Sequence, residues 1–267
     1  MKVPILDHGY IELVETWGSD ERIVEAARMS TGKGFIGWGG LPCPQCEEAH
    51  RLDERDGLFR DSAAKKEAEE FCVCKGAGKT VGDEKLLAYL WDHKHATPFE
   101  MAGMVIEVMA PIMVYREWHR HRTQSYNELS ARYTPLPDVN YVPTVERLMV
   151  NSKTNKQAGT IKGAEELTVE SALLFQNRLI EMYQRQQELY QWSLDRGVPK
   201  ELARVHLPVG RYSRMRASAN LRNWLAFLTL RMAPAAQFEV RQYANAVGDL
   251  IAANFPRTWS LFRKELT

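Results

Sequence analysis

Apolar and polar positions along the chain follow two different periods. In residues 10–16, YIELVET, apolar and polar side chains alternate as they do in a half-buried strand. Residues 104–110, MVIEVMA, also have strand character, and residues 210–219, GRYSRMRASA, alternate again. The pattern therefore predicts strands at these three places, separated by helical segments.

The helices of the first half are bounded by capping residues. Ser19 or Asp20 is placed to cap a helix within SDERIVEAARMS. We expect Asp83 to cap a second helix within EKLLAYLWDHKH, which ends before Pro98. Pro111 is placed to open a third helix through IMVYREWHRHR.

The second half of the chain is mostly helical. A long helix over about residues 165–196 is closed by Gly197. Asn220 is placed to cap a helix with an apolar stripe, and a last long helix covers about residues 235–254. Long helices with a few antiparallel strands indicate an α+β fold, in which an antiparallel or mixed sheet packs against the helices.

Residues 32–82 differ from the rest in composition, because Gly, Cys and charged residues replace the apolar period. We interpret them as an insertion within one domain that spans residues 1–267. The insertion begins with GKGFIG, residues 32–37, which matches G-x-G-x-x-G and has Asp53 further on. A dinucleotide-binding turn follows a buried strand, whereas this segment follows an amphipathic helix, so we favour a loop.

Composition restricts the class of protein. The 267 residues are 45% hydrophobic and 26% charged, which is typical of a globular chain, and the net charge is only +1. A general nucleic-acid or membrane-surface protein usually carries a large basic excess, so neither partner is expected. The N-terminus has no apolar signal region and no run of eighteen apolar residues occurs, so we expect a cytoplasmic protein.

All four cysteines lie in the insertion, as a C-x-x-C pair and a C-x-C pair: Cys43, Cys46, Cys72 and Cys74. Four thiolates suit a tetrahedral structural Zn²⁺ site, which would stabilise a segment too polar to form its own core. The second pair has one residue between its ligands where two are usual. The sequence leaves structural zinc and free thiols open, and no acid or base beside the cysteines suggests catalysis.

The segment YREWHRHRTQSYNELSARY, residues 115–133, concentrates cations in a nearly neutral chain. A solvated basic helix face is the ordinary explanation for such a run. Here the guanidinium groups are mixed with hydroxyl, amide and carboxylate groups, a combination that suits a phosphate together with a sugar or base. Ser130 as a hydrolase nucleophile is disfavoured, because no G-x-S-x-G turn surrounds it. We therefore expect a nucleotide site.

Within this segment, RHRTQSYNELS followed by ARY resembles the signature of the flavin-dependent thymidylate synthases. Other segments agree with that family in the same order along the chain: ARMS, HATPFE, ARVHLP, ANLRNWLAFLTLR and AAQFEVRQYA. The resemblance covers nearly everything outside residues 32–82. It implies an α+β homotetramer that makes dTMP from dUMP, with methylenetetrahydrofolate, NADPH and FAD, at sites built between subunits.

The resemblance also implies a set of site residues. Those that would bind FAD are Ser30, Thr97, Glu100, Arg120, His121, Arg122, Glu128, Asn220 and Arg222. Those that would bind dUMP, partly from a neighbouring subunit, are Glu117, Arg120, Glu128, Ser130, Ala131, Arg132, Arg204 and Arg231. Those that would lie near the folate and flavin rings are His95 and Tyr133.

Arg231 is the expected catalytic residue. A guanidinium beside uracil N3 favours the N3-deprotonated form, which pushes electron density toward C5, the atom that attacks the one-carbon carrier. No protein nucleophile is then needed, which fits a chain whose cysteines all lie outside the matched segments. Reduced flavin would supply the hydride, since no side chain can.

Two residues depart from the family pattern. Glu117 stands where Gln is common, three residues before Arg120, so either a phosphate contact is remodelled or Glu117 pairs with a neighbouring arginine. Ala226 replaces a polar Asn or His that often contacts FAD. The alternative functions are a zinc-stapled nucleic-acid-binding module and a flavoprotein oxidoreductase without methyl transfer.

Overall fold

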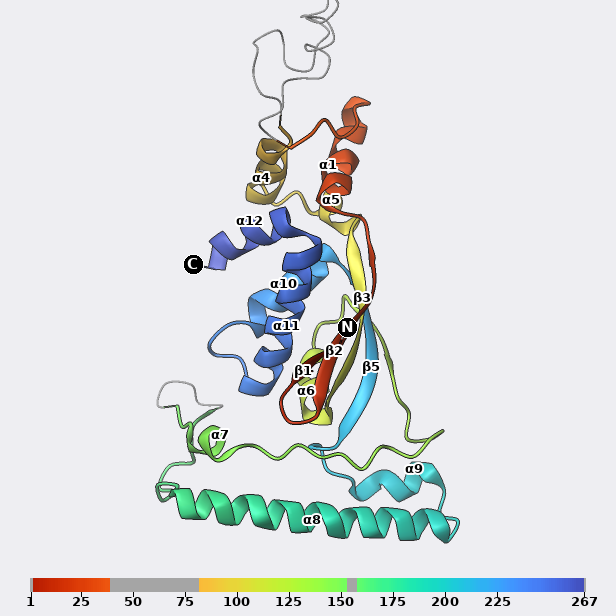
Figure 1. Cartoon of the computed structure of the whole chain (residues 1–267), viewed down its shortest axis with the longest axis vertical. Helices are drawn as coiled ribbons and strands as arrows, with labels where there is room; N and C mark the ends of the chain where they lie inside the picture. Colours follow the sequence, from red (N-terminus) through yellow and green to blue (C-terminus); the bar gives the residue numbers. More distant parts are fainter. Residues whose placement is uncertain (1, 39–81, 153–157, 267) are drawn as a thin grey trace, which may run out of the picture. The chain divides into compact units, whose positions relative to one another are not determined.

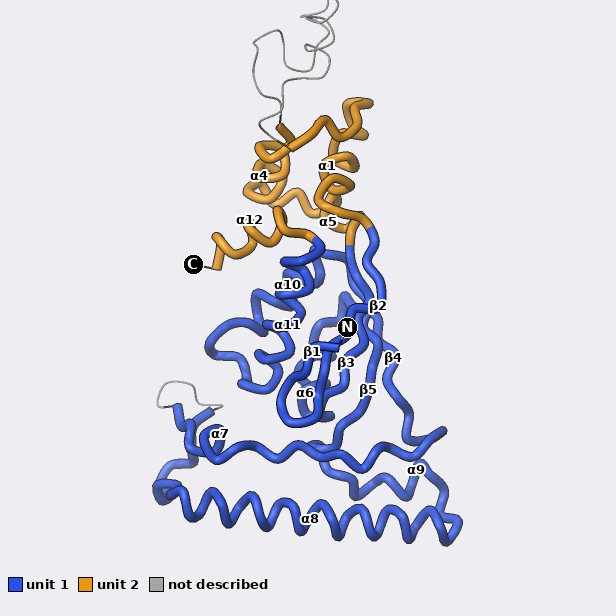
Figure 2. Tube along the Cα trace, viewed as in Figure 1, with its two compact units in different colours: residues 1–17, 103–254 blue, residues 18–102, 255–267 orange. Residues whose placement is uncertain are grey.

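A computed structural model describes residues 2–38, 82–152 and 158–266. The chain forms two compact units, which are coloured in Figure 2. The first comprises Met1–Trp17 and Gly103–Asn254, and the second comprises Gly18–Ala102 and Phe255–Thr267. The cysteines expected to bind zinc lie outside the described residues, and the single-domain organisation stays a prediction.

The first unit is built on a five-stranded antiparallel sheet with the order β1-β2-β3-β5-β4. Its strands are β1 (Lys2–Ile5), β2 (Gly9–Trp17), β3 (Gly103–Pro111), β4 (Ser125–Glu128) and β5 (Tyr212–Asn220). β2, β3 and β5 lie where the alternating pattern places them. The sheet and the long helices around it confirm the α+β class.

Helices α6 (Ile112–Trp118), α10 (Leu221–Arg231) and α11 (Phe238–Asn254) pack on this sheet (Figure 1). β3 turns Met104 and Ile106 into the core, where both are fully buried. Trp224 of α10 donates from Nε1 to the carbonyl oxygen of Met104 at 3.1 Å. This bond satisfies a buried donor and fixes the start of α10 against β3.

Asn220 caps α10, as the sequence predicts, because its side chain accepts from Asn223 N at 2.9 Å. α6 is shorter than expected. It ends at Trp118 instead of continuing through residue 122, because the Trp118 ring is fully buried and Nε1 bonds Gln124, which turns the chain.

The same unit carries α7 (Val145–Met149), α8 (Val169–Asp195), α9 (Lys200–Ala203) and the 3-10 turn η3 (Arg204–His206). α8 begins later than predicted because Thr168 caps it by accepting from Ser171 N. It ends before Gly197, which adopts φ 77° and so stops the helix as expected.

The second unit is helical, with α1 (Asp20–Arg28), η1 (Met29–Thr31), α4 (Glu84–Asp92), α5 (Ala96–Glu100) and α12 (Pro256–Leu266). Ser19 caps α1 by accepting from Arg22 N. Asp20 is buried and accepts from the backbone N–H groups of Arg257 and Thr258, so it joins the two chain segments of this unit.

Asp83 does not cap α4 with its side chain as the sequence suggested. Its fully buried carboxylate instead pairs with Arg28 and accepts from the backbone N–H groups of Ile36 and Gly37. A guanidinium and two amides compensate a buried carboxylate better than one helix N–H does, which explains the difference.

The GKGFIG segment follows α1 and η1 rather than a strand, in agreement with the loop interpretation. Within the described ranges, no helix is long and apolar enough to cross a membrane.

Candidate functional site

The segment after α6 presents two arginines to solvent. Trp118 stacks on Phe227 with ring centroids 4.6 Å apart, and its Nε1 donates to Gln124 Oε1 at 3.0 Å. These buried contacts anchor both ends of the intervening loop. Arg120 and Arg122 of that loop are exposed and available to an anion.

Arg231, at the C-terminal end of α10, is held by three hydrogen bonds. Nε donates to His121 Nε2 at 2.9 Å, Nη1 donates to Glu117 Oε2 at 2.8 Å, and Nη2 donates to the carbonyl oxygen of Glu117 at 2.7 Å. A guanidinium has five N–H donors, so two remain for a ligand. Of the two expectations for Glu117, pairing with a neighbouring arginine is the one observed.

His121 is uncharged at neutral pH. Burial, and then the neighbouring Arg231 cation, lower the pKa of His121 to about 4, against the opposing effect of the Glu117 carboxylate. Because Nε2 accepts from Arg231, the hydrogen-bond network assigns the ring proton to Nδ1. A neutral His121 therefore acts as an acceptor that orients the guanidinium.

A cavity of about 1390 Å³ opens beside this cluster, within the first unit. Small-molecule sites typically occupy roughly 300–1,000 Å³, so a nucleotide fits. Apolar groups such as Leu230 and Phe238 line part of the wall. The charged side chains that line it are Asp7, Glu117, Glu146, Arg147, Arg231 and Arg241.

The sequence singled out only two of these charged residues. Arg147 is engaged by the buried carboxylate of Glu239 at 2.8 Å, and Arg241 donates to the carbonyl oxygen of Pro234 at 2.8 Å. A basic residue in a polar segment resembles any solvated side chain, so only the fold shows that these two arginines reach the cavity.

Residues 129–133 form a compact turn after β4. Ser130 Oγ accepts from Arg132 N and Arg132 Nε, both at 3.4 Å, and Tyr133 N donates to the carbonyl oxygen of Ser130 at 3.0 Å. Arg132 and Tyr133 are exposed. Lys200, which the sequence did not single out, donates from Nζ to the Tyr133 carbonyl oxygen at 3.3 Å and adds a cation to this turn.

Three more predicted residues lie in the same region of the first unit. Glu128 is exposed at the end of β4, Ala131 is buried and Arg204 is half-buried at the start of η3. Neither they nor Ser130 belong to the lining of the cavity beside Arg231. The cavity beside Arg231 is therefore lined by only two of the predicted dUMP residues, Glu117 and Arg231.

The first turn of α10 is tied to the arginine-bearing loop, because Asn223 Nδ2 donates to the carbonyl oxygen of Thr123 at 3.0 Å. Arg222, in this turn, is exposed, and so is Ala226 one turn later. The helix N-terminus and the loop thus present their cations from linked elements.

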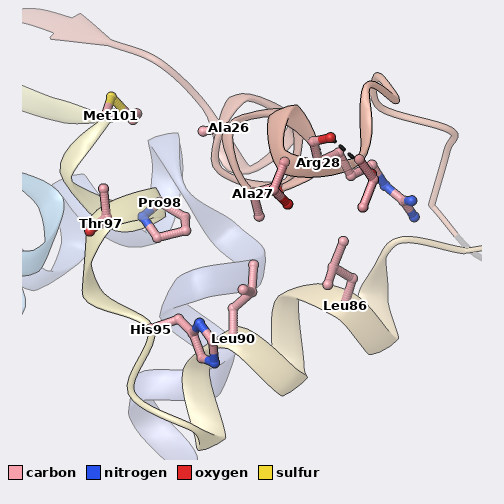
Figure 3. A pocket seen from close by; sticks show the side chains of 11 residues that line it. Ala26, Ala27, Arg28, Leu86, Leu90, His95, Thr97, Pro98 and Met101 are labelled. Carbon is pink, nitrogen blue, oxygen red and sulfur yellow. Dashed lines mark hydrogen bonds between the residues drawn. The ribbon is translucent and has the colours of Figure 1, made fainter.

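The second unit contains a smaller pocket of about 460 Å³, shown in Figure 3. Leu86 and Leu90 of α4 face Ala26 and Ala27 of α1 across it. The predicted site residues that line it are Ser30, His95 and Thr97.

Glu100 lies in α5 with Thr97 but does not belong to this lining. The pocket combines hydroxyl and imidazole groups with an apolar wall, which suits part of an aromatic ligand. No group of three or more metal-ligating side chains occurs in the part of the chain that the structure describes.

Comparison with known proteins identifies relatives along the full chain. The family model described as thymidylate synthase complementing protein matches residues 12–257, which run through both units. A flavin-dependent thymidylate synthase from Thermus thermophilus is 34% identical over 270 residues, covering 100% of this chain and 80% of the relative. The one from Kosmotoga olearia is 32% identical, covering 98% and 93%.

Solved structures of related methylases have a similar fold along nearly the whole chain. A UMP/dUMP methylase, PolB, from Streptomyces cacaoi bound with 5-Br dUMP has a TM-score of 0.70 and 28% identity, covering 98% of this chain and 97% of that one. The same methylase bound with 5-Br UMP has a TM-score of 0.69 and 26% identity, covering 96% and 94%.

Proposed function

Since the chain belongs to the family of flavin-dependent thymidylate synthases, we propose that it methylates dUMP at C5 to form dTMP. The one-carbon unit comes from methylenetetrahydrofolate and the reducing equivalents come from NADPH, so the other products are tetrahydrofolate and NADP⁺. FAD, when bound, supplies the hydride that completes the methyl group.

The observation that carries this proposal is the constrained guanidinium of Arg231 at the edge of a nucleotide-sized cavity. Three of its donors are used by His121 and Glu117, and two remain for uracil. A fixed cation beside N3 and an adjacent carbonyl oxygen stabilises the N3 anion, which makes C5 more nucleophilic. Because its donors are already oriented, Arg231 needs little reorganisation during the reaction.

The phosphate of dUMP requires cations other than the one at the pyrimidine. Arg120 is exposed beside the Arg231 cluster, whereas the Glu117 carboxylate cannot donate to a phosphate. We assign the rest of the dUMP contacts to Ser130, Arg132 and Arg204. Because these residues do not line the cavity of their own chain, a neighbouring subunit supplies them.

The residues present fit FAD in chemical type. Arg120 and Arg122 are exposed cations that suit a diphosphate. The pocket lined by Ser30, His95 and Thr97 adds hydroxyl groups and an apolar wall. Its volume of about 460 Å³ holds only part of so large a cofactor, which again requires groups from elsewhere. We also assign Glu100, Glu128, Asn220 and Arg222 to the FAD site, and we propose that Tyr133 lies near the folate and flavin rings.

We propose that the sites form in a homotetramer, and α8 supports association of copies. Phe175, Met182 and Leu189 recur every seven residues on this 27-residue helix, and they are 47%, 51% and 48% exposed. Such a stripe of large apolar side chains is typical of a helix that packs against another helix. We place the enzyme in the cytoplasm.

The first test is spectroscopic. The protein is mixed with FAD, freed of excess, and its visible spectrum is recorded before and after adding dUMP or UMP. Retained flavin whose band changes with dUMP supports a shared site, and comparison with UMP measures selectivity for the deoxyribose. A protein that retains no flavin in either condition would overturn the proposal and favour the nucleic-acid-binding alternative, which predicts steeply salt-dependent binding.

A further inference from the structure

Glu117 is unusual among the residues around Arg231 because it contacts the guanidinium twice. Its carboxylate accepts from Nη1 at 2.8 Å and its own carbonyl oxygen accepts from Nη2 at 2.7 Å. The Arg231 side chain is 15% exposed, whereas the Glu117 side chain is 43% exposed at the cavity wall. A negative charge therefore lies in direct contact with the cation that is expected to act on the substrate.

The two contacts have different consequences. The carbonyl oxygen belongs to the backbone of α6, so it holds Arg231 in place in any variant that keeps that helix. The carboxylate adds a charge that a glutamine would not, although the glutamine amide oxygen could accept the same bond. Orientation and charge can thus be separated by a single substitution.

We propose that Glu117 is a positioning residue that also sets the acidity of the bound pyrimidine: it orients Arg231 and offsets part of the guanidinium's attraction for the N3 anion. This inference rests on the proposed function. Without the carboxylate, the cation acts on N3 at full strength, and N3 loses its proton at lower pH. With it, the anion forms less readily, and the free cation is not left unpaired in the empty site.

The other ionisable groups around Arg231 keep one protonation state near neutral pH. His121 is uncharged because burial and Arg231 lower its pKa to about 4. Arg147 and Arg241 add two guanidinium groups to the cavity wall, and a guanidinium group remains protonated in proteins. The remaining acids of the wall are Asp7 and Glu146, and hydrogen bonds from its own backbone N–H and from Thr144 lower the pKa of Glu146. Burial raises the pKa of Tyr141, which also lines the wall. A change between pH 6.5 and 9 thus reports mainly the pyrimidine.

The test measures N3 ionisation directly, without turnover. 5-Fluoro-dUMP is bound to the FAD-loaded protein and its ¹⁹F chemical shift is followed from pH 6.5 to 9. The variants are Glu117→Gln, and Glu15→Gln as a matched control, since Glu15 is an exposed acid of β2 that does not line the cavity. Thermal unfolding of each variant checks that the fold is kept.

We expect the N3 midpoint in the wild-type complex to lie below that of free 5-fluoro-dUMP. Glu117→Gln should lower it further by about one pH unit, the size that Coulomb's law gives for one charge several ångströms away at an effective dielectric of about 20–40. Glu15→Gln should leave it within about 0.3 unit, because a distant exposed charge is screened. The acid limb of kcat for dTMP formation should move with the bound midpoint.

A Glu117→Gln midpoint that equals the wild-type value, or lies above it, would overturn the inference while leaving the synthase proposal intact. A wild-type midpoint equal to that of the free nucleotide would overturn both the role of Arg231 and that of Glu117. Wild-type protein that binds no uridine nucleotide would instead refute the proposed function itself.

Discussion

Asp20 is expected to be a costly polar residue to remove from the helical unit. Its side chain is 3% exposed and accepts three hydrogen bonds from the start of α12. Arg257 N donates to Oδ2 at 2.8 Å, and Thr258 donates to Oδ1 from its backbone N at 3.2 Å and from Oγ1 at 2.6 Å. The substitution Asp20→Ala removes both acceptor oxygens, and with them all three hydrogen bonds, and leaves the donors without partners.

The magnitude follows from these contacts. A hydrogen bond to a charged group contributes roughly 1.5–3 kcal/mol, and a carboxylate near a helix N-terminus adds about 0.3–1 kcal/mol. Because bonds that share one carboxylate do not add fully, we expect Asp20→Ala to cost about 3–5 kcal/mol. Thr258→Val removes only the hydroxyl bond to the carboxylate and should cost about 1.5–3 kcal/mol.

Hydrogen exchange measured by mass spectrometry tests this locally. Peptides from α1 and α12 should lose protection in Asp20→Ala, with opening free energies reduced by the amounts above, while β3 peptides change less. Protein concentration must be held constant because association of copies stabilises the native state. If Asp20→Ala costs no more than Thr258→Val, the carboxylate adds nothing beyond the hydroxyl contact and the reasoning is wrong.

Three other outcomes are expected. Arg231→Lys keeps a charge but loses the planar fork, so kcat for dTMP formation should fall about 10²–10³-fold with the unfolding temperature little changed, and a near-normal kcat would exclude a guanidinium-specific role. His121 should titrate near pH 4 by NMR. Because this pKa is below that of an unfolded histidine, the contribution of His121 to stability is lost as pH falls from about 6.5 toward 4. A measured midpoint near 6.5 would contradict the assignment of His121 as an uncharged hydrogen-bond acceptor. Met182→Glu on α8 should shift light-scattering mass toward smaller species, whereas the neighbouring exposed Gln184→Glu should not; an unchanged mass for both would exclude this face from the interface.

The strands and helices that the sequence predicted are those with a clear period or cap. β3 was predicted as a strand because its buried residues alternate. The start of α10 was predicted from Asn220, which caps the helix in the structure. α12 and β4 were missed. β4 has only four residues, and its pairing with β5 is a long-range interaction that local patterns do not encode.

The candidate site was predicted from a sequence motif rather than from the spacing of apolar residues. RHRTQSYNELS marked Arg120, His121 and Ser130, but Arg231, which contacts His121, comes from a distant part of the chain. Glu117 and Arg231 are 114 residues apart, and no local rule joins them. Asp83 shows the opposite error, because a helix-capping pattern was present but a buried ion pair with Arg28 determines its side-chain position.

The decisive experiment is the conversion of dUMP to dTMP by the FAD-loaded protein. The reaction is run with methylenetetrahydrofolate and NADPH, and the nucleotide product is identified by mass spectrometry. The proposed function predicts that dTMP appears only when flavin, folate donor and reductant are all present, and that its formation is strongly reduced in Arg231→Lys. Protein that binds FAD and dUMP but forms no dTMP under these conditions would contradict it.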